Sequence, residues 1–137
     1  MRRLWQVLAA AIATWALAIG PSYAGFTPQQ FTTFGHLNEH NGTLLPGCHR
    51  SYYWSYSIYP PRGYDWQVNL RVIAPGGKQV ASDALIRGAD PLNGRKYYML
   101  CSAVAPRGEY TLLATMTLTD QINSWTGHLP VWHFWLR

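Results

Sequence analysis

The fold is decided by the stretch Tyr64-Asp65-Trp66-Gln67-Val68-Asn69-Leu70-Arg71-Val72. Apolar and polar residues alternate through it without interruption. Side chains of a β-strand point alternately to opposite faces, so this pattern predicts an antiparallel strand with one face in a core and the other in solvent. The residues predicted to face inward are Trp66, Val68, Leu70 and Val72. The turn sequence Pro75-Gly76-Gly77 follows the strand.

The same alternation recurs along the rest of the chain. Residues 109–119 place Tyr110 and four more apolar residues on one face and mainly threonines on the other, a composition suited to a half-exposed strand. Weaker strands are predicted at residues 51–59, 78–86, 96–104 and 131–136, and Pro- and Gly-containing turns separate them. Six to seven short strands with frequent turns predict an all-β fold, an antiparallel β-sandwich.

The stretch Pro106-Arg107-Gly108-Glu109-Tyr110-Thr111-Leu112 resembles the corner that leads into a late strand of immunoglobulin-like and fibronectin-like sandwiches. The resemblance implies that Tyr110 is a corner tyrosine. The order Cys48, Trp66, Cys101 is also similar to that of antibody domains, whose disulfide spans the two sheets. Tyr110 follows the second cysteine instead of preceding it, so a disulfide that ties the N-terminal segment to a sheet is the alternative.

The first 24 residues predict a removable export signal. Two arginines at positions 2 and 3 precede an apolar run that ends at Gly20-Pro21, and Ser22-Tyr23-Ala24 offers small residues for cleavage. The run is short and lies close to the cleavage site, so no stable membrane span is expected after cleavage. The predicted organisation is a signal at 1–24, an irregular N-terminal segment at 25–47 and a single sandwich domain at 48–137.

Export places the protein outside the cytoplasm, in the medium, the periplasm or the cell wall. In such an oxidising compartment, Cys48 and Cys101 are predicted to form a disulfide. The chain has 11 Lys and Arg residues against 6 Asp and Glu, and the cations are scattered. Nucleic-acid binders gather their cations into a stripe, so this distribution excludes a nucleic-acid partner.

No catalytic site, metal site or cofactor is predicted. His36-Leu37-Asn38-Glu39-His40 matches the letters of a zinc-protease motif, but the segment has no helical pattern to bring both histidines to one face. Solvated loop histidines are expected there, and a non-catalytic metal site that uses His36, His40 or His49 is the alternative. The chain has no G-x-S-x-G sequence and no obvious carboxylate pair on a buried strand face.

The aromatic residues supply the candidate ligand site. Strand parity directs Tyr53, Tyr59, His133 and Trp135 outward if Trp54 and Phe134 belong to the core. Exposed Tyr and Trp bind sugars or protein partners. The alternative is that Trp135 packs beneath the N-terminal segment. Asn41-Gly42-Thr43 is in addition a glycosylation acceptor sequence.

These features predict an exported, non-catalytic binding or accessory domain that recognises an extracellular or cell-surface protein. A carbohydrate-binding module that uses exposed Tyr and Trp is the first alternative. The second is a secreted enzyme inhibitor, with residues 25–47 or the loop Asp90–Gly94 as the contact.

Overall fold

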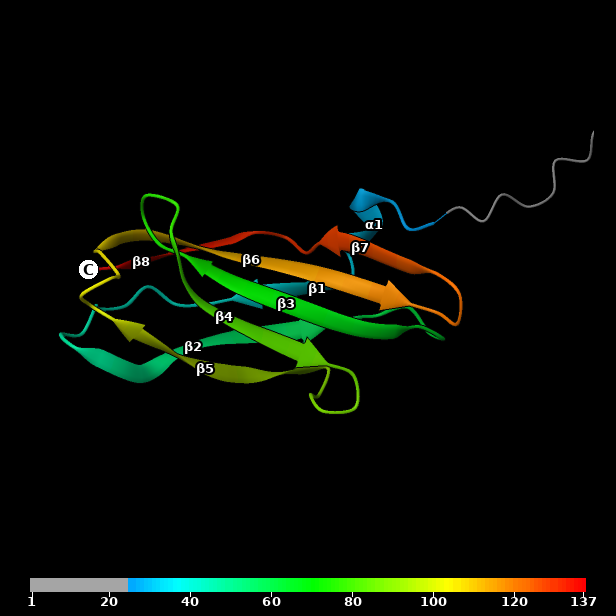
Figure 1. The fold of residues 1–137 in the computed structure, drawn as a ribbon, viewed down its shortest axis with the longest axis horizontal. Coiled ribbons are helices and arrows are strands. Elements are labelled where there is room, and N and C mark those ends of the chain that lie inside the picture. Colours follow the sequence, from blue (N-terminus) through cyan, green and yellow to red (C-terminus); the bar gives the residue numbers. More distant parts are fainter. Residues whose placement is uncertain (1–24) are drawn as a thin grey trace, which may run out of the picture.

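A computed structural model describes residues 25–137, and the predicted export signal lies outside the described residues. The chain forms two β-sheets that pack face to face, seen as two layers in Figure 1. The predicted all-β sandwich is therefore confirmed, with eight strands in place of six to seven. The elements are α1 (Pro28–Phe31), β1 (Gly35–Asn38), β2 (Cys48–Ile58), β3 (Asp65–Ile73), β4 (Gln79–Ile86), β5 (Asn93–Cys101), β6 (Gly108–Thr119), β7 (Ser124–His128) and β8 (Trp132–Leu136).

The first sheet has the order β1-β2-β5 and the second the order β4-β3-β6-β7, with β8 also paired to β6. Strand β4 pairs with β3, whereas in constant-type immunoglobulin domains the fourth strand extends the first sheet. Strands β7 and β8 lie along β6 in succession, opposite residues 115–119 and 108–112. Pro130 lies between them and has no N–H to donate, so the pairing is interrupted there.

The core lies between the sheets and follows the alternation of the sequence. Trp66, Val68, Leu70 and Val72 of β3 are all buried, as predicted, and so are the even-numbered residues 110–118 of β6. The register of β3 on β6 sets Val68 opposite Met116. Because β3 and β6 are the two central strands of their sheet, their inward faces form the middle of the core.

The predicted corner tyrosine is confirmed. The Tyr110 hydroxyl donates a hydrogen bond to the Pro106 carbonyl, four residues upstream in the corner that leads into β6. Its ring stacks on Phe134 of β8 with 5.4 Å between centroids. The corner therefore joins the loop before β6 to the core beneath β8.

The predicted disulfide between Cys48 and Cys101 is present, but it does not span the two sheets. Cys48 begins β2, Cys101 ends β5, and the two residues are register partners with 4.0 Å between Cα atoms. The bond closes one end of the three-stranded sheet. It therefore differs from the disulfide of antibody domains, and it joins two strands instead of tying down the N-terminal segment.

The segment 25–47, predicted to be irregular, contains two short regular elements, α1 and β1, and is otherwise without helix or strand. Thr27 and Gln30 form a capping box around α1, and Phe31 of this helix packs against Gly127 of β7, where an added Cβ would clash with the phenylalanine ring. Strand β1 pairs with β2, and Gly42 then donates its N–H to Trp135 of β8 at 2.8 Å. Elements of four residues are too short to show a hydrophobic period, so the sequence pattern missed them.

Within residues 25–137, no helix has the length and apolar character needed to cross a membrane.

Candidate functional site

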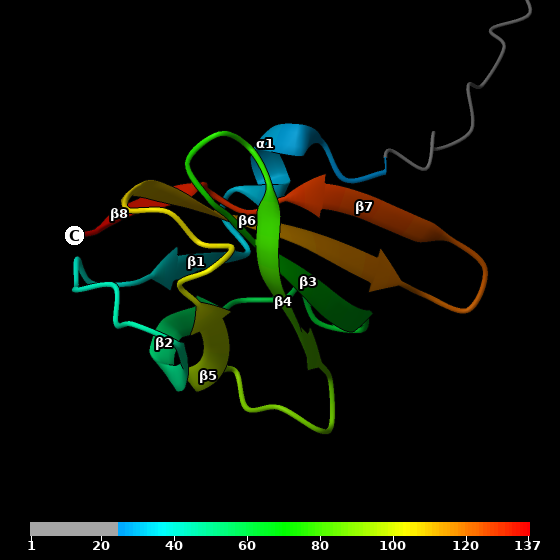
Figure 2. The same cartoon turned by 60° about the vertical axis from the view of Figure 1, so that its left-hand side comes forward.

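The outer side of the sheet β1-β2-β5 presents a row of aromatic and polar side chains. In Figures 1 and 2 none of the other described elements lies over this side of β2 and β5. We call this surface the tyrosine face, and it comprises His36, Asn38, Tyr53, Ser55, Ser57, Asn93, Arg95 and Tyr97, with His40 and Tyr59 at its ends. The alternate residues of β2, such as Trp54 and Tyr56, are buried, which directs the odd-numbered residues outward.

Cross-strand contacts order the centre of the tyrosine face. Tyr53 and Tyr97 are directly opposite in the register, with ring centroids 5.6 Å apart and planes at 56°. The guanidinium carbon of Arg95 lies 4.0 Å from the Tyr53 ring centroid, a cation–π geometry. His40 approaches Tyr53 edge-on at 6.3 Å, and Tyr97 remains 54% exposed. The face is therefore an ordered aromatic surface that solvent reaches.

The tyrosine face carries no acidic side chain. Strands β1, β2 and β5 contain no Asp or Glu, while Arg95 and two histidines point outward from the face or its end. Two half-buried acids at the edge between β4 and β5, Asp83 and Asp90, pair with Lys96 at 3.5 and 3.1 Å. The face is consequently neutral to positive.

The structure divides the four predicted ligand-binding residues between two opposite surfaces. Tyr53 and Tyr59 lie on or beside the tyrosine face, and the Tyr59 ring is 5.9 Å from that of His36. His133 and Trp135 lie on β8, on the outer side of the second sheet, where His133 Nδ1 is 3.3 Å from a Glu109 carboxylate oxygen. Tyr53 and Tyr59 therefore share a surface with Tyr97, whereas His133 and Trp135 lie on the other sheet.

The alternative for Trp135, burial beneath the N-terminal segment, is not what the structure shows. Its side chain is 44% exposed. Contact with the N-terminal segment is made by its backbone instead, which donates to Asn41 Oδ1 at 2.8 Å and accepts from the Gly42 N–H. Asn41, the predicted glycosylation acceptor, is itself exposed.

Sequence reasoning missed Arg95 and Tyr97. The run Arg95-Lys96-Tyr97-Tyr98 does not alternate between polar and apolar residues, so its two faces could not be assigned from the pattern. The register against β2 assigns them, because Tyr98 pairs with buried Tyr52 and Tyr97 pairs with outward Tyr53. The sequence offered no signal for them, because parity fixes faces only within one strand and the register is set by tertiary pairing.

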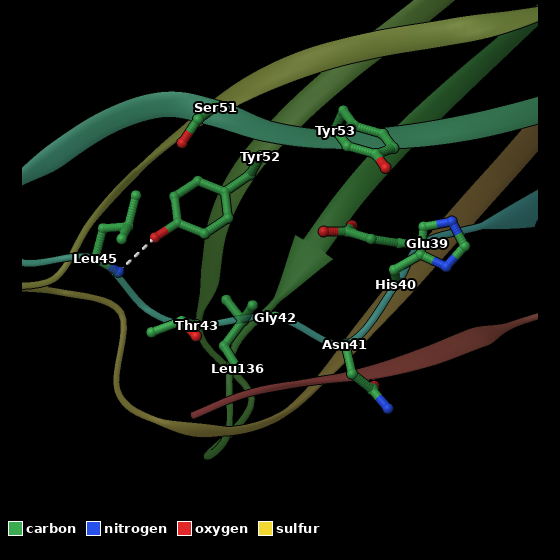
Figure 3. Close-up of a pocket in the computed structure, with 10 residues that line it drawn as sticks. All are labelled: Glu39, His40, Asn41, Gly42, Thr43, Leu45, Ser51, Tyr52, Tyr53 and Leu136. Atoms are coloured by element: carbon green, nitrogen blue, oxygen red, sulfur yellow. Dashed lines mark hydrogen bonds between the residues drawn. The ribbon is translucent and has the colours of Figure 1, made fainter.

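A groove of about 250 Å³ adjoins the tyrosine face. It forms where the chain leaves β1 after Asn38 and crosses to pair with β8 through Gly42. Figure 3 shows Ser51, Tyr52 and Tyr53 on one side of the groove and the segment from Glu39 to Leu45, with Leu136, on the other. Tyr53 and His40 line the groove and also belong to the tyrosine face.

Glu39 places a carboxyl group at the inner wall of this groove. The residue is 7% exposed, and the Tyr98 hydroxyl lies 2.7 and 2.8 Å from its two carboxyl oxygens. Its carbonyl accepts a hydrogen bond from Trp132 Nε1 at 2.9 Å, which joins it to β8. Burial raises the pKa of Glu39 to about 8, although the Tyr98 hydrogen bond opposes the shift. Burial and the adjacent carboxyl likewise raise the pKa of Tyr98.

The motif His36-Leu37-Asn38-Glu39-His40 lies on and after a strand, not on a helix. Its two histidines are exposed, whereas Glu39 points inward. Within residues 25–137, no three His, Cys, Asp or Glu side chains are grouped so that they could hold a metal ion.

The segments proposed as inhibitory contacts are integrated into the sandwich. Asp90 accepts a hydrogen bond from the Ile86 N–H at 2.9 Å and pairs with Lys96, and Asn93-Gly94 already belong to β5.

No protein-family model matches the chain, and no curated protein or solved structure matches it with significance. The chemistry of the tyrosine face and its groove is therefore the basis for a functional assignment.

Proposed function

We propose that the chain is an exported, non-catalytic binding module that recognises an extracellular or cell-surface protein through the tyrosine face. The observation that carries the proposal is the composition of that face, in which tyrosines stand among Ser, Asn, His and Arg side chains on an uncovered sheet. Tyrosine supplies a large contact area at low entropic cost, and Ser and Asn supply adaptable hydrogen bonds, as in antibody binding surfaces. Tyr and Arg are also the residues enriched at interface hot spots.

The lack of acidic side chains on this face indicates the charge of the partner. The guanidinium carbon of Arg95 lies 4.0 Å from the Tyr53 ring centroid, and a guanidinium has five N–H groups with which it could donate to carboxylates of a partner. The acids of the neighbouring edge, Asp83 and Asp90, are paired with Lys96. The face therefore complements an acidic protein surface, which it would attract at long range in a salt-dependent manner.

Export rests on two independent observations. The first 24 residues have the charge, apolar run and cleavage site of a removable signal. The Cys48–Cys101 disulfide is the kind of bond that persists in oxidising compartments.

Carbohydrate binding is the second candidate, and one observation favours it. Tyr53, Tyr59 and Tyr97 are surrounded by hydroxyl and amide groups that could bind sugar hydroxyls. However, the planes of Tyr53 and Tyr97 differ by 56°, so the two rings do not form the flat platform on which a sugar chain stacks. The protein partner is therefore preferred.

The experiment that tests the proposal is retention on the immobilised mature chain. Extracellular proteins of the source and a panel of polysaccharides are passed over the wild type, a Tyr97→Ser variant and a Trp135→Ala control. Trp135 is an exposed aromatic residue on the opposite sheet, so its removal matches the loss of ring area without touching the tyrosine face.

Protein ligands that the wild type and Trp135→Ala retain, and that Tyr97→Ser loses at least tenfold, would support the proposal. Retention of one polysaccharide with the same pattern would replace the protein partner by a glycan. Retention that Trp135→Ala loses and Tyr97→Ser keeps would move the site to the other sheet.

A further inference from the structure

The groove beside the tyrosine face combines a buried carboxyl group with aromatic and apolar walls. Glu39 is the one acidic residue in its lining, and the walls include Tyr52, Tyr53 and Leu136. No other lining residue is Asp, Glu, Lys or Arg. A cavity with apolar walls and one oriented charged group is the usual form of a small-ligand site, and a carboxyl with a strongly raised pKa is a further mark of one.

The protein leaves the hydrogen-bonding capacity of the Glu39 carboxyl partly unused. An ionised carboxylate accepts about four hydrogen bonds. Tyr98 has a single hydroxyl proton, shared between the two oxygens at 2.7 and 2.8 Å, and within the described residues no cation pairs with Glu39. A ligand that brings both a positive charge and several N–H donors would offset what burial costs this group.

We propose that the groove binds a protonated primary amine, with its ammonium group against the Glu39 carboxylate and its alkyl chain between Tyr53 and Leu136. An ammonium ion supplies three donors and the opposite charge, and the aromatic walls add cation–π attraction. An anion is disfavoured because the carboxyl would repel it. This inference does not depend on the tyrosine face being the protein-binding surface.

Binding of the ammonium is coupled to loss of a proton. With its pKa raised to about 8, Glu39 is mostly protonated at pH 7, so the ion pair forms as the carboxyl releases its proton to solvent. The apparent affinity then rises about tenfold per pH unit up to about pH 8 and levels above it. The titratable groups around Glu39 are Tyr98 from β5, which is hydrogen-bonded to its carboxyl, and Tyr52 and His40, which line the same groove. From β8 the Trp132 indole, which does not titrate, donates to the backbone carbonyl of Glu39.

The test is a titration of the mature chain with n-butylammonium, followed by the backbone amide signals of Gly42 and Ser51 in the groove. The Thr117 amide, on the opposite sheet, serves as a reference. At pH 8 we expect saturable shifts at the groove amides, and at least tenfold weaker binding of 1-butanol, which has the same alkyl chain without the charge. Affinity at pH 6.5 is expected to be at least tenfold lower than at pH 8.

Two variants locate the effect. Glu39→Gln keeps an acceptor for Tyr98 and is expected to lose the preference for the ammonium over the alcohol. Glu109→Gln, which removes an exposed carboxyl on the opposite sheet, is expected to keep both that preference and the pH dependence. Calorimetry of the wild type in buffers of different ionisation enthalpy is expected to show release of close to one proton at pH 7, which tests the site even if Glu39→Gln does not fold. Equal binding of the alcohol, absence of proton release, or no groove shifts at all would each overturn the inference.

Discussion

Replacing Glu39 by Gln should make the chain more stable at pH 8 and change its stability little at pH 4.5. Burial raises the pKa of Glu39 from an ordinary value of 4.5 to about 8 in the folded chain. Between these values the folded carboxyl keeps its proton while the unfolded one has lost it, so unfolding releases a proton. The free energy of unfolding therefore falls as the pH rises from 4.5 to about 8, and the effect is complete above that value.

The size of this effect follows from the pKa values. One pKa unit corresponds to about 1.4 kcal/mol, so the shift from 4.5 to about 8 is equivalent to roughly 5 kcal/mol. That is a large fraction of the about 5–15 kcal/mol that typically separates folded from unfolded domains. The glutamine side chain of the variant carries no charge at any pH, and its amide oxygen can still accept from the Tyr98 hydroxyl, which lies 2.7 Å from the carboxyl oxygen in the native pair.

The assay is urea unfolding of the wild type and Glu39→Gln at intervals from pH 4.5 to 9, with the disulfide intact. The difference in free energy of unfolding between the two proteins should grow by several kcal/mol over this range and then remain constant. Glu109→Gln is the control, since Glu109 is exposed and its partner is the exposed His133. A difference for Glu39→Gln that does not vary with pH would refute the reasoning, because the buried carboxyl would then be ionised in both states.

Three further changes test the sandwich itself. Tyr110→Phe removes the hydroxyl that holds the corner before β6 and is expected to cost about 1–2 kcal/mol in urea unfolding; an unchanged midpoint would show that the corner bond contributes nothing. Gly127→Ala forces a methyl group against the buried phenylalanine of α1 and should cost about 1–3 kcal/mol, whereas Gly42→Ala meets its nearest neighbour at 3.6 Å and should cost less than about 0.5 kcal/mol. Replacing Cys48 and Cys101 together by Ala opens a loop with a sequence separation of 53 and should lower the free energy of unfolding by about 4 kcal/mol; equal stability of the oxidised protein and the double variant would contradict this.

The strands that were predictable are those in which one face is buried and the other is not. On β3 the pattern from Asp65 to Val72 alternates at each residue, because a half-buried strand needs a different chemistry on each face. The same rule assigned Trp54 to the core and directed Tyr53 outward. It failed for β1 and β7, which have four and five residues and include Gly35 and Gly127 at positions where a side chain would meet neighbouring atoms.

The candidate site was only half predictable, for a related reason. Alternation places Tyr53 on the outer side of its own strand, but it says nothing about which strand lies beside it. Tyr97 was not assigned because Tyr97 and Tyr98 are the same residue type with opposite orientations. Glu39 was considered only as part of a metal motif, since no local pattern marks a carboxyl that turns into the core.

By itself the sequence determined the sandwich class, the inward faces of the long strands and the pairing of the two cysteines, since these depend on composition or on neighbours within a few residues. The tertiary structure alone decided that Tyr53 meets Tyr97, that His133 and Trp135 lie on the opposite sheet, and that Glu39 meets the hydroxyl of Tyr98, 59 residues away. The physical reason is that strand pairing joins residues that are far apart in the sequence. The pairing and its register are set by how the two sheets bury their apolar faces. The same register then fixes which residues are neighbours on the polar outer faces.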